Sequence, residues 1–236
     1  MSTMRIKVSQ LVYGDFTKPD HWFAKYVEPI NQVYCDLHGY RYVVERRDSV
    51  RTDRHGNWEK VSHIQRQLTD CDYLWFMDAD CCFYAHPIAI HEELVRMLLP
   101  DKLFLGTVCA VDERHRWHET APECSPQVCN TGVMLIKNTE LSRRIVAEWD
   151  AVTDTPGFKH LRWQYPLEER GLTQYILPKY GRYIQVHPEY YMMQGTFSYF
   201  VRHICCGAGQ DREAVFQEMY HSPLMERNRK LREALR

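Results

Sequence analysis

Asp78 and Asp80 are the residues best suited to chemistry, because they stand two apart directly after the apolar run YLWFM at residues 73–77. Side chains alternate along an extended segment, so both carboxylates are expected on one side. Converging carboxylates repel each other unless a cation joins them, and hard oxygen ligands suit Mg²⁺ or Mn²⁺. The pattern predicts a divalent-metal site at the carboxyl edge of a sheet, where open α/β folds bind ligands. The alternative is a pair of solvated loop aspartates.

The segments that must position this pair alternate between strand-like and helix-like patterns. Strands are expected at residues 6–13, 40–44, 73–77, 103–108, 133–136 and 183–186, and helices at 21–39, 60–68, 87–98, 139–150 and 167–177. This order predicts an α/β fold with a mostly parallel central sheet flanked by helices. Residues 45–57 are expected to form a surface loop. We expect one domain over residues 1–210 and a helical C-terminal extension, 211–236, packed on it.

Charge, cysteine content and the N-terminus restrict the class of protein. The 30 Lys and Arg balance 31 Asp and Glu, so no nucleic-acid partner is expected. Nine cysteines, with adjacent pairs at residues 81–82 and 205–206, favour free thiols in a reducing compartment. Neither a signal peptide nor a run of membrane-spanning length is apparent, so we expect a cytoplasmic protein. A luminal enzyme trimmed of its anchor is the alternative.

The segment DYLWFMDAD at residues 72–80 resembles the Asp-x-Asp motif of GT-A glycosyltransferases. It is most similar to the retaining family of fungal α-galactosyltransferases and plant xyloglucan α-xylosyltransferases. Three further segments resemble that family in the same order, namely WEK at 58–60, CNTGVMLIKN at 129–138 and FVRHICCG at 200–207. The resemblance implies a single-domain GT-A (Rossmann-like) fold. It also implies metal-dependent transfer of a hexose or pentose from a nucleotide-diphosphate sugar, most commonly a UDP-sugar, to an acceptor hydroxyl with retention.

The resemblance further implies which residues hold the metal. Asp80 would bind it directly, Asp78 would contact the metal, the ribose or both, and His203 would be the third ligand. An imidazole beside carboxylates favours Mn²⁺ over Mg²⁺. The cation would stabilise the charge that develops on the leaving β-phosphate. Without its FVRHICCG context, His203 would be read as an ordinary core or loop histidine.

Donor-binding roles are expected for Tyr13, Lys60, Asn130, Gly132 and Gly207. A tyrosine can stack on the base, a lysine offers a point charge to phosphate, and an amide can bind sugar hydroxyls. Glycine lets main-chain N–H groups approach the diphosphate. An ordinary alternative stays open for each: a packing tyrosine, a surface lysine, a strand-edge turn or a turn glycine.

Glu168 and Glu169 are the candidate catalytic residues. They lie where the family carries an acidic pair followed by Gln, although Arg170 here replaces the amide. We favour Glu169 as either the nucleophile of a double displacement or the group that stabilises an oxocarbenium-like centre. The helix dipole alone also explains two carboxylates at a helix start, and an inverting mechanism with an acidic base stays open.

The acceptor and two rival functions complete the predictions. Residues 112–127 combine His, Trp and acidic side chains that suit a sugar acceptor, such as a glycan or glycoconjugate, or simply form a surface loop. A haloacid-dehalogenase-like phosphatase also places Asp-x-Asp after an apolar strand, but usually near the start of the chain and with Thr or Val where Cys82 stands. A non-catalytic nucleotide-sugar-binding protein is the other alternative.

Overall fold

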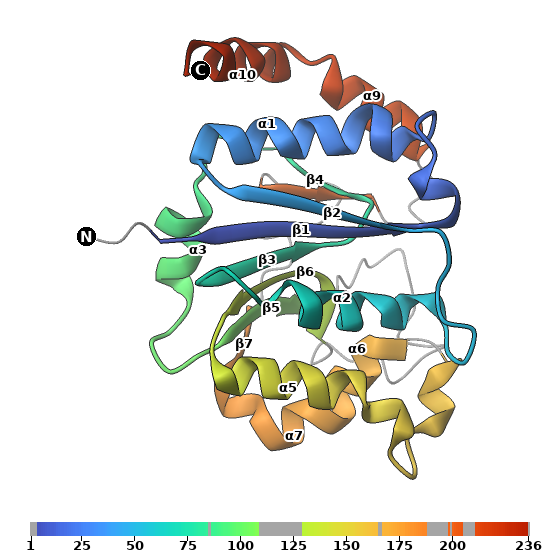
Figure 1. Ribbon diagram of the computed structural model, residues 1–236. Coiled ribbons are helices and arrows are strands. Elements are labelled where there is room, and N and C mark those ends of the chain that lie inside the picture. The colour runs from blue at the N-terminus through green and yellow to red at the C-terminus, as the bar shows by residue number, and fades with distance from the viewer. Residues whose placement is uncertain are drawn as a thin grey trace.

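A six-stranded sheet forms the centre of the computed structural model, which describes residues 4–84, 86–108, 129–164, 167–187, 198, 200–204 and 211–235. Its order is β2-β1-β3-β6-β5-β7 (Figure 1). The strands are β1 (Ile6–Tyr13), β2 (Arg41–Arg47), β3 (Tyr73–Met77), β5 (Phe104–Val108), β6 (Cys129–Lys137) and β7 (Ile184–His187). Three neighbouring pairs are parallel, whereas β6 runs antiparallel to both β3 and β5. The predicted α/β fold with a mostly parallel sheet is confirmed.

Helices cover both faces of this sheet (Figure 1). They are α1 (Glu28–His38), α2 (Glu59–Gln67), α3 (Ile90–Met97), α5 (Glu140–Asp150), α6 (Leu167–Gly171), α7 (Leu177–Tyr180), α9 (Arg212–Tyr220) and α10 (Pro223–Ala234). Short helical turns are η1 (Gly14–Thr17), η2 (Phe23–Val27), η3 (Gly56–Trp58), η4 (Val152–Asp154), η5 (Lys159–Arg162), η6 (Leu172–Ile176) and η7 (Gly181–Tyr183).

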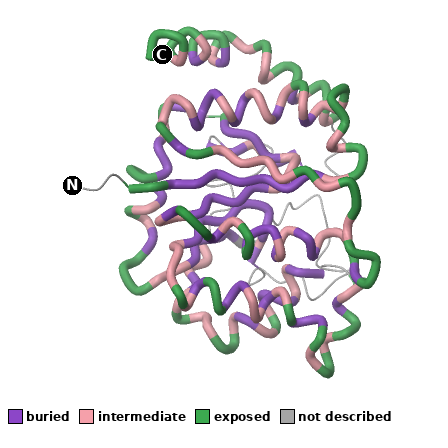
Figure 2. Tube along the Cα trace, in the orientation of Figure 1, coloured by how far each residue is buried: buried purple, intermediate pink, exposed green. Residues whose placement is uncertain are grey.

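Strand β3 shows why the run before Asp78 is apolar throughout. Leu74 and Phe76 join the core cluster under α2 and α5, while Trp75 and Met77 join the cluster under α1 and α3. A strand that is covered on both faces needs apolar residues at every position rather than at every second one. Figure 2 shows this burial along the central strands.

A second, two-stranded sheet was not expected from the sequence. Strand β4 (Cys81–Phe83) pairs antiparallel with β8 (Val201–His203), and Cys81 stands opposite His203. Three-residue strands are too short to show a period. The expected extended geometry of Asp78 and Asp80 is wrong, because the chain turns there to enter β4 and the N–H of Cys81 donates to the Asp78 carbonyl at 3.1 Å.

Other boundaries differ modestly from expectation. Strand β2 continues to Arg47, so residues 45–47 are not loop; as a sheet edge, this strand tolerates charged side chains. Helix α3 begins at Ile90 rather than at 87, because Ala89 is extended. The predicted helix at 21–39 consists of η2 followed by α1, and the one at 167–177 continues to Tyr180 through η6 and α7.

The C-terminal helices α9 and α10 lie over α1 (Figure 1). Phe216 of α9 stacks on Trp22 with ring centroids 5.1 Å apart, and Met225 of α10 joins the same apolar cluster as Val27 and Ile30. The division of the chain at residue 210 stays a prediction.

No helix in the described ranges has the length and apolar character needed to cross a membrane. The five described cysteines are buried and form no disulfide with one another.

Candidate active site

A cavity of about 400 Å³ opens at the carboxyl ends of β1 and β3. It gathers most of the residues that the sequence singled out, which are Tyr13, Lys60, Asp78, Asp80, Asn130, Glu168, Glu169 and His203. These side chains come from segments up to 190 positions apart, and the sheet brings their ends to one edge. The roles of these residues stay predictions; what the structure adds is their mutual geometry.

Asp80 lies between two positive partners. Its Oδ1 is 3.3 Å from Nε2 of His203, and its Oδ2 is 3.1 Å from Nη2 of Arg212. Burial alone would raise the pKa of Asp80, but His203 and Arg212 outweigh burial and lower it. The same contact raises the pKa of His203 against its own burial. Asp80 is therefore held as a carboxylate.

Gly132 leaves room for the imidazole ring of His203. A Cβ at Gly132 would stand 2.5 Å from Cε1 of the imidazole, so only glycine leaves room for this ring. The N–H of Gly132 donates to Oδ1 of Asn130 at 2.8 Å, and its carbonyl accepts from the N–H of Asp78 at 2.7 Å. Gly132 thus joins strand β6 to the acidic turn, a packing role that complements the predicted donor-binding one.

Lys60 joins the acidic turn to the glutamate pair. Its Nζ lies 2.9 Å from Oδ2 of Asp78 and 2.9 Å from Oε1 of Glu168. Burial by itself would lower the pKa of this lysine, but Asp78 and Glu168 raise it well above its ordinary value. Burial and the charge of Asp80 raise the pKa of Asp78. The lysine expected to contact phosphate is engaged by two carboxylates.

The two glutamates differ in burial and in partners. Glu168 is 2% exposed, and its Oε1 accepts from Oγ1 of Thr131 at 3.2 Å as well as from Lys60. Oε1 of Glu169 accepts from the N–H of Thr131 at 3.2 Å. Burial, reinforced by the neighbouring charge of Glu168, raises the pKa of Glu169 to about 7. The two glutamates thus place a carboxyl group of raised pKa next to one that is engaged by Lys60, at one edge of the cavity.

The cavity contains donors that fit a divalent cation. Ligand atoms of Asp80, Cys81 and His203 all lie within 4.8 Å of one another, the one such set among the described residues. Asp78 lines the same cavity but stands outside this set, paired with Lys60. A carboxylate with an imidazole suits Mn²⁺ better than Mg²⁺. The residue types thus fit the predicted metal at Asp80 and His203.

Several residues of the site were missed from sequence. Gln10 donates from Nε2 to the carbonyls of Asp78 (2.8 Å) and Cys81 (3.0 Å), and Asn31 donates to the latter at 3.1 Å. Gln10 is a polar residue inside the apolar strand IKVSQLVY, and this signal could have identified it. Arg212 carried no comparable signal, because it opens a charged helix.

One wall of the cavity contains Tyr13, Phe16, Gly56 and Asn57. A Cβ at Gly56 would stand 3.1 Å from the hydroxyl of Tyr13, so η3 approaches this ring closely. Burial raises the pKa of Tyr13. Gly207 and the predicted acceptor segment at 112–127 lie outside the described residues.

Comparison with known proteins identifies the family. The galactosyl transferase GMA12/MNN10 family matches residues 13–184. A search of curated proteins gave no significant match.

Solved structures resemble the chain over nearly its whole length. A glycosyltransferase involved in the glycosylation of the major capsid of PBCV-1 has a TM-score of 0.68 at 15% identity, with 92% of this chain and 100% of that chain aligned. The galactosyltransferase LgtC, solved with donor and acceptor sugar analogs, has a TM-score of 0.59 at 12% identity, with 90% and 94% aligned. GlyE from Streptococcus pneumoniae TIGR4 has a TM-score of 0.57 at 12% identity, with 97% and 63% aligned.

At these identities the structural likeness establishes the fold, and the family match establishes the class of enzyme. A haloacid-dehalogenase-like phosphatase is thereby excluded. The chain belongs to the galactosyl transferase GMA12/MNN10 family and is a glycosyltransferase with the GT-A fold.

Proposed function

We propose that this glycosyltransferase is metal-dependent and moves a hexose or pentose from a UDP-sugar to a hydroxyl of a glycan or glycoconjugate, with retention. The observation that carries the proposal is one cavity with two acidic groupings. Asp80 with His203 lines it together with Glu168 and Glu169, and Lys60 lies between Asp78 and Glu168. The first grouping suits a metal–diphosphate, and the second suits the carbon from which the diphosphate leaves.

Asp80 and His203 would hold the Mn²⁺, with Asp78 beside them. The cation supplies Lewis-acid stabilisation of the charge on the departing diphosphate. Lys60 holds Asp78 and Glu168 in place and keeps positive charge next to the same cavity. Tyr13 and Asn57 flank the position that we assign to the base.

Glu169 is the carboxylate that we assign to the reacting sugar. Oε1 of Glu168 is already engaged by Lys60 and Thr131, which suits a supporting role. In the reaction the bond from the anomeric carbon to the phosphate oxygen breaks, and a bond from that carbon to the acceptor oxygen forms. The acceptor proton leaves on the phosphate, while a carboxylate at Glu169 stabilises positive charge on the sugar.

Thermal stability with UDP, GDP or ADP, each with Mn²⁺ or EDTA, tests the donor site. A ligand at about a hundred times its dissociation constant adds roughly 2.7 kcal/mol to the free energy of unfolding. We expect a Mn²⁺-dependent increase in melting temperature with UDP in wild type and in the control Asp53→Asn, but none in Asp80→Ala. Asp53 is a suitable control because its ion pair with Arg51 is exposed.

Two outcomes contradict the proposal. Stabilisation by GDP or ADP instead of UDP would mean that the donor carries guanine or adenine rather than uracil. No stabilisation by any nucleotide would reject the donor site. Release of UDP from a UDP-sugar separates an active enzyme from a non-catalytic binding protein. The anomeric configuration of the product, measured by NMR, decides retention.

A further inference from the structure

Cys81, which directly follows the acidic motif, belongs to the same cluster as Asp80 and His203. The sequence predicted no metal-binding role for it. Its Sγ lies within 4.8 Å of ligand atoms of both residues. The antiparallel register of β4 and β8 sets Cys81 opposite His203, and directly paired residues project to the same face of a two-stranded sheet. The convergence of sulfur and imidazole is therefore built into the strand pairing.

The backbone at Cys81 is fixed by buried amides. Its carbonyl accepts from Gln10 at 3.0 Å and from Asn31 at 3.1 Å, and both of these side chains are completely buried. Oδ1 of Asn31 also accepts from the N–H of Phe83 at 3.0 Å. Because two strands and a helix hold this short segment, the sulfur is presented to the cluster from a rigid position.

Asp78 lies outside this three-residue set, and its Oδ2 pairs with Lys60 at 2.9 Å. A metal that takes this oxygen would compete with a buried ion pair. Sγ of Cys81 donates weakly to the Gly132 carbonyl at 3.8 Å, a contact that a metal bound to the sulfur would replace.

We propose that Cys81 is a metal ligand of this site, so that Asp80, Cys81 and His203 form a mixed oxygen, sulfur and nitrogen centre selective for thiophilic divalent ions. On binding, the thiol releases its proton to solvent and the sulfur lone pair forms the bond to the metal. Thiolate ligands favour Zn²⁺, Cd²⁺ and Co²⁺ relative to Mn²⁺. The proposal rests on the metal site of the proposed function and adds that Zn²⁺ or Cd²⁺ displaces Mn²⁺ from it.

Titration with Co²⁺ tests this ligand directly, because a thiolate bound to cobalt gives a charge-transfer band in the near ultraviolet. We expect the band in wild type and its loss in Cys81→Ser and Cys81→Ala. The matched control is Cys82→Ser, since Sγ of this adjacent cysteine contacts Sδ of Met219 at 3.8 Å instead. This variant should keep the band.

Affinity provides a second readout. Loss of Cys81 should raise the dissociation constant for Cd²⁺ at least about tenfold, the lower end of what loss of even an outer-shell partner costs. The dissociation constant for Mn²⁺ should change much less, because Mn²⁺ gains little from sulfur. If both Cys81 variants fail to fold, absence of the band in wild type or its loss in Cys82→Ser would still overturn the proposal.

The results that overturn the proposal are a wild-type protein that binds Co²⁺ without the band, a band that Cys81→Ser or Cys81→Ala retains, or a band that a control variant loses. Wild-type stabilisation by UDP and Mn²⁺ with no thiolate band would reject only the sulfur ligand. Absence of both the band and the nucleotide effect would reject the metal site itself.

Discussion

Glu168 and Glu169 are neighbours in one helical turn, but their carboxyl groups have different surroundings. Glu168 contacts Lys60, whose Nζ lies 2.9 Å from its Oε1. Glu169 faces that negative charge in a buried position, and its pKa rises from 4.5 to about 7. Both residues lie in the first turn of α6, but a five-residue helix has little dipole to stabilise them. The raised pKa of Glu169 therefore comes first from its burial and second from the charge of Glu168.

Glu169→Gln tests this electrostatic difference through the pH dependence of stability. Between pH 4.5 and about 7 the folded protein keeps a proton on Glu169 that the unfolded chain has released. Stability from this group is thus complete below pH 4.5 and is lost as pH rises through that window. The variant should be more stable than wild type at pH 8 by about 1–3 kcal/mol, measured by urea unfolding. Equal pH profiles for the two proteins would contradict the shift.

Glu168→Gln should behave in the opposite way. It removes the partner of a buried lysine, and breaking such a pair costs about 3–5 kcal/mol. Because Lys60 keeps Asp78, the lower end of this range is expected. Urea unfolding at pH 8 measures this loss.

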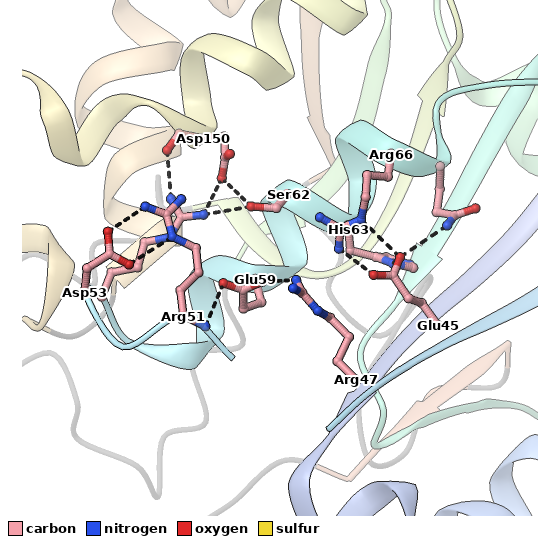
Figure 3. Close-up of polar contacts among 11 residues, drawn as sticks. Glu45, Arg47, Arg51, Asp53, Glu59, Ser62, His63, Arg66 and Asp150 are labelled. Carbon is pink, nitrogen blue, oxygen red and sulfur yellow. Dashed lines mark hydrogen bonds and ion pairs between the residues drawn. The ribbon is translucent and has the colours of Figure 1, made fainter. Parts of the chain in front are cut away.

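At the scale of elements, the segment between β2 and α2 forms one wall of the cavity. The sequence indicated a surface loop there, yet Arg54 is 3% exposed. Its guanidinium donates to Oδ1 and the carbonyl oxygen of Asp150 at 2.7 and 2.9 Å, and to Ser62 at 2.7 Å. Figure 3 shows Asp150 and Ser62 in this group of contacts on the left, and a separate group in which Glu45 contacts His63 and Arg66 on the right. These contacts fix the segment that brings Gly56 next to Tyr13.

Asp150→Ala should therefore weaken the donor site from a distance. It leaves the Arg54 guanidinium without its carboxylate, which we expect to cost about 3 kcal/mol in unfolding free energy. The dissociation constant for UDP should rise as Gly56 and Asn57 loosen, which isothermal titration calorimetry measures. Asp53→Ala removes a solvent-exposed pair and should stay within about 0.5 kcal/mol of wild type. Equal effects of the two variants on UDP affinity would show that the contact between Arg54 and Asp150 does not position Gly56 and Asn57.

The elements differ in how far sequence could predict them. The apolar runs of β1, β3 and β6 showed their strands, and the Asp-x-Asp motif showed where the site begins. The β4–β8 pair stayed hidden because three-residue strands separated by about 120 positions have no local signal. Cys81 and Arg212 were missed for the same reason: each reaches the site only through tertiary pairing. The pattern identified residue types, and the fold determined which of them meet.

Helix α9 adds a cation to the site from beyond the part of the chain that matches the family. Arg212 opens this helix, which Asp211 caps by accepting from the N–H of Glu213 at 3.0 Å. Arg212 also donates from Nε to the carbonyl of Ile204 at 2.8 Å, so its guanidinium is held beside Asp80. An arginine and a metal ion there compete for the same carboxylate.

Arg212→Gln should change metal and nucleotide affinity in opposite directions. Mn²⁺ should bind roughly two- to fivefold more tightly, since a partly exposed ion pair contributes up to about 1 kcal/mol. UDP without metal should bind more weakly, because a positive charge near the phosphates is lost. Both constants come from calorimetry with Mn²⁺ alone and with UDP in EDTA. A parallel loss of both affinities would instead indicate that α9 has moved.

On the scale of the whole molecule, α9 and α10 complete the apolar layer beside the active site. Phe216 and Met225 share one buried cluster with Val12 from the end of β1 and with Ile30 from α1. The C-terminal segment is therefore coupled to the strand end that carries Tyr13, as well as to Asp80 through Arg212. Truncation at residue 210 would both expose this apolar cluster and remove the Arg212 guanidinium from the site.

Phe216→Ala measures that coupling without removing the segment. Deleting a buried phenylalanine side chain should lower the free energy of unfolding by about 3–5 kcal/mol. Leu235→Ala is the control, because Leu235 is 71% exposed and its loss should cost less than about 0.5 kcal/mol. Urea unfolding gives both values, and calorimetry on the folded variant gives its affinity for UDP with Mn²⁺. If Phe216→Ala loses stability but keeps full affinity, the C-terminal helices support the fold alone. We expect both to fall, because Arg212 opens the helix that carries Phe216 and Tyr13 directly follows Val12 of the same cluster.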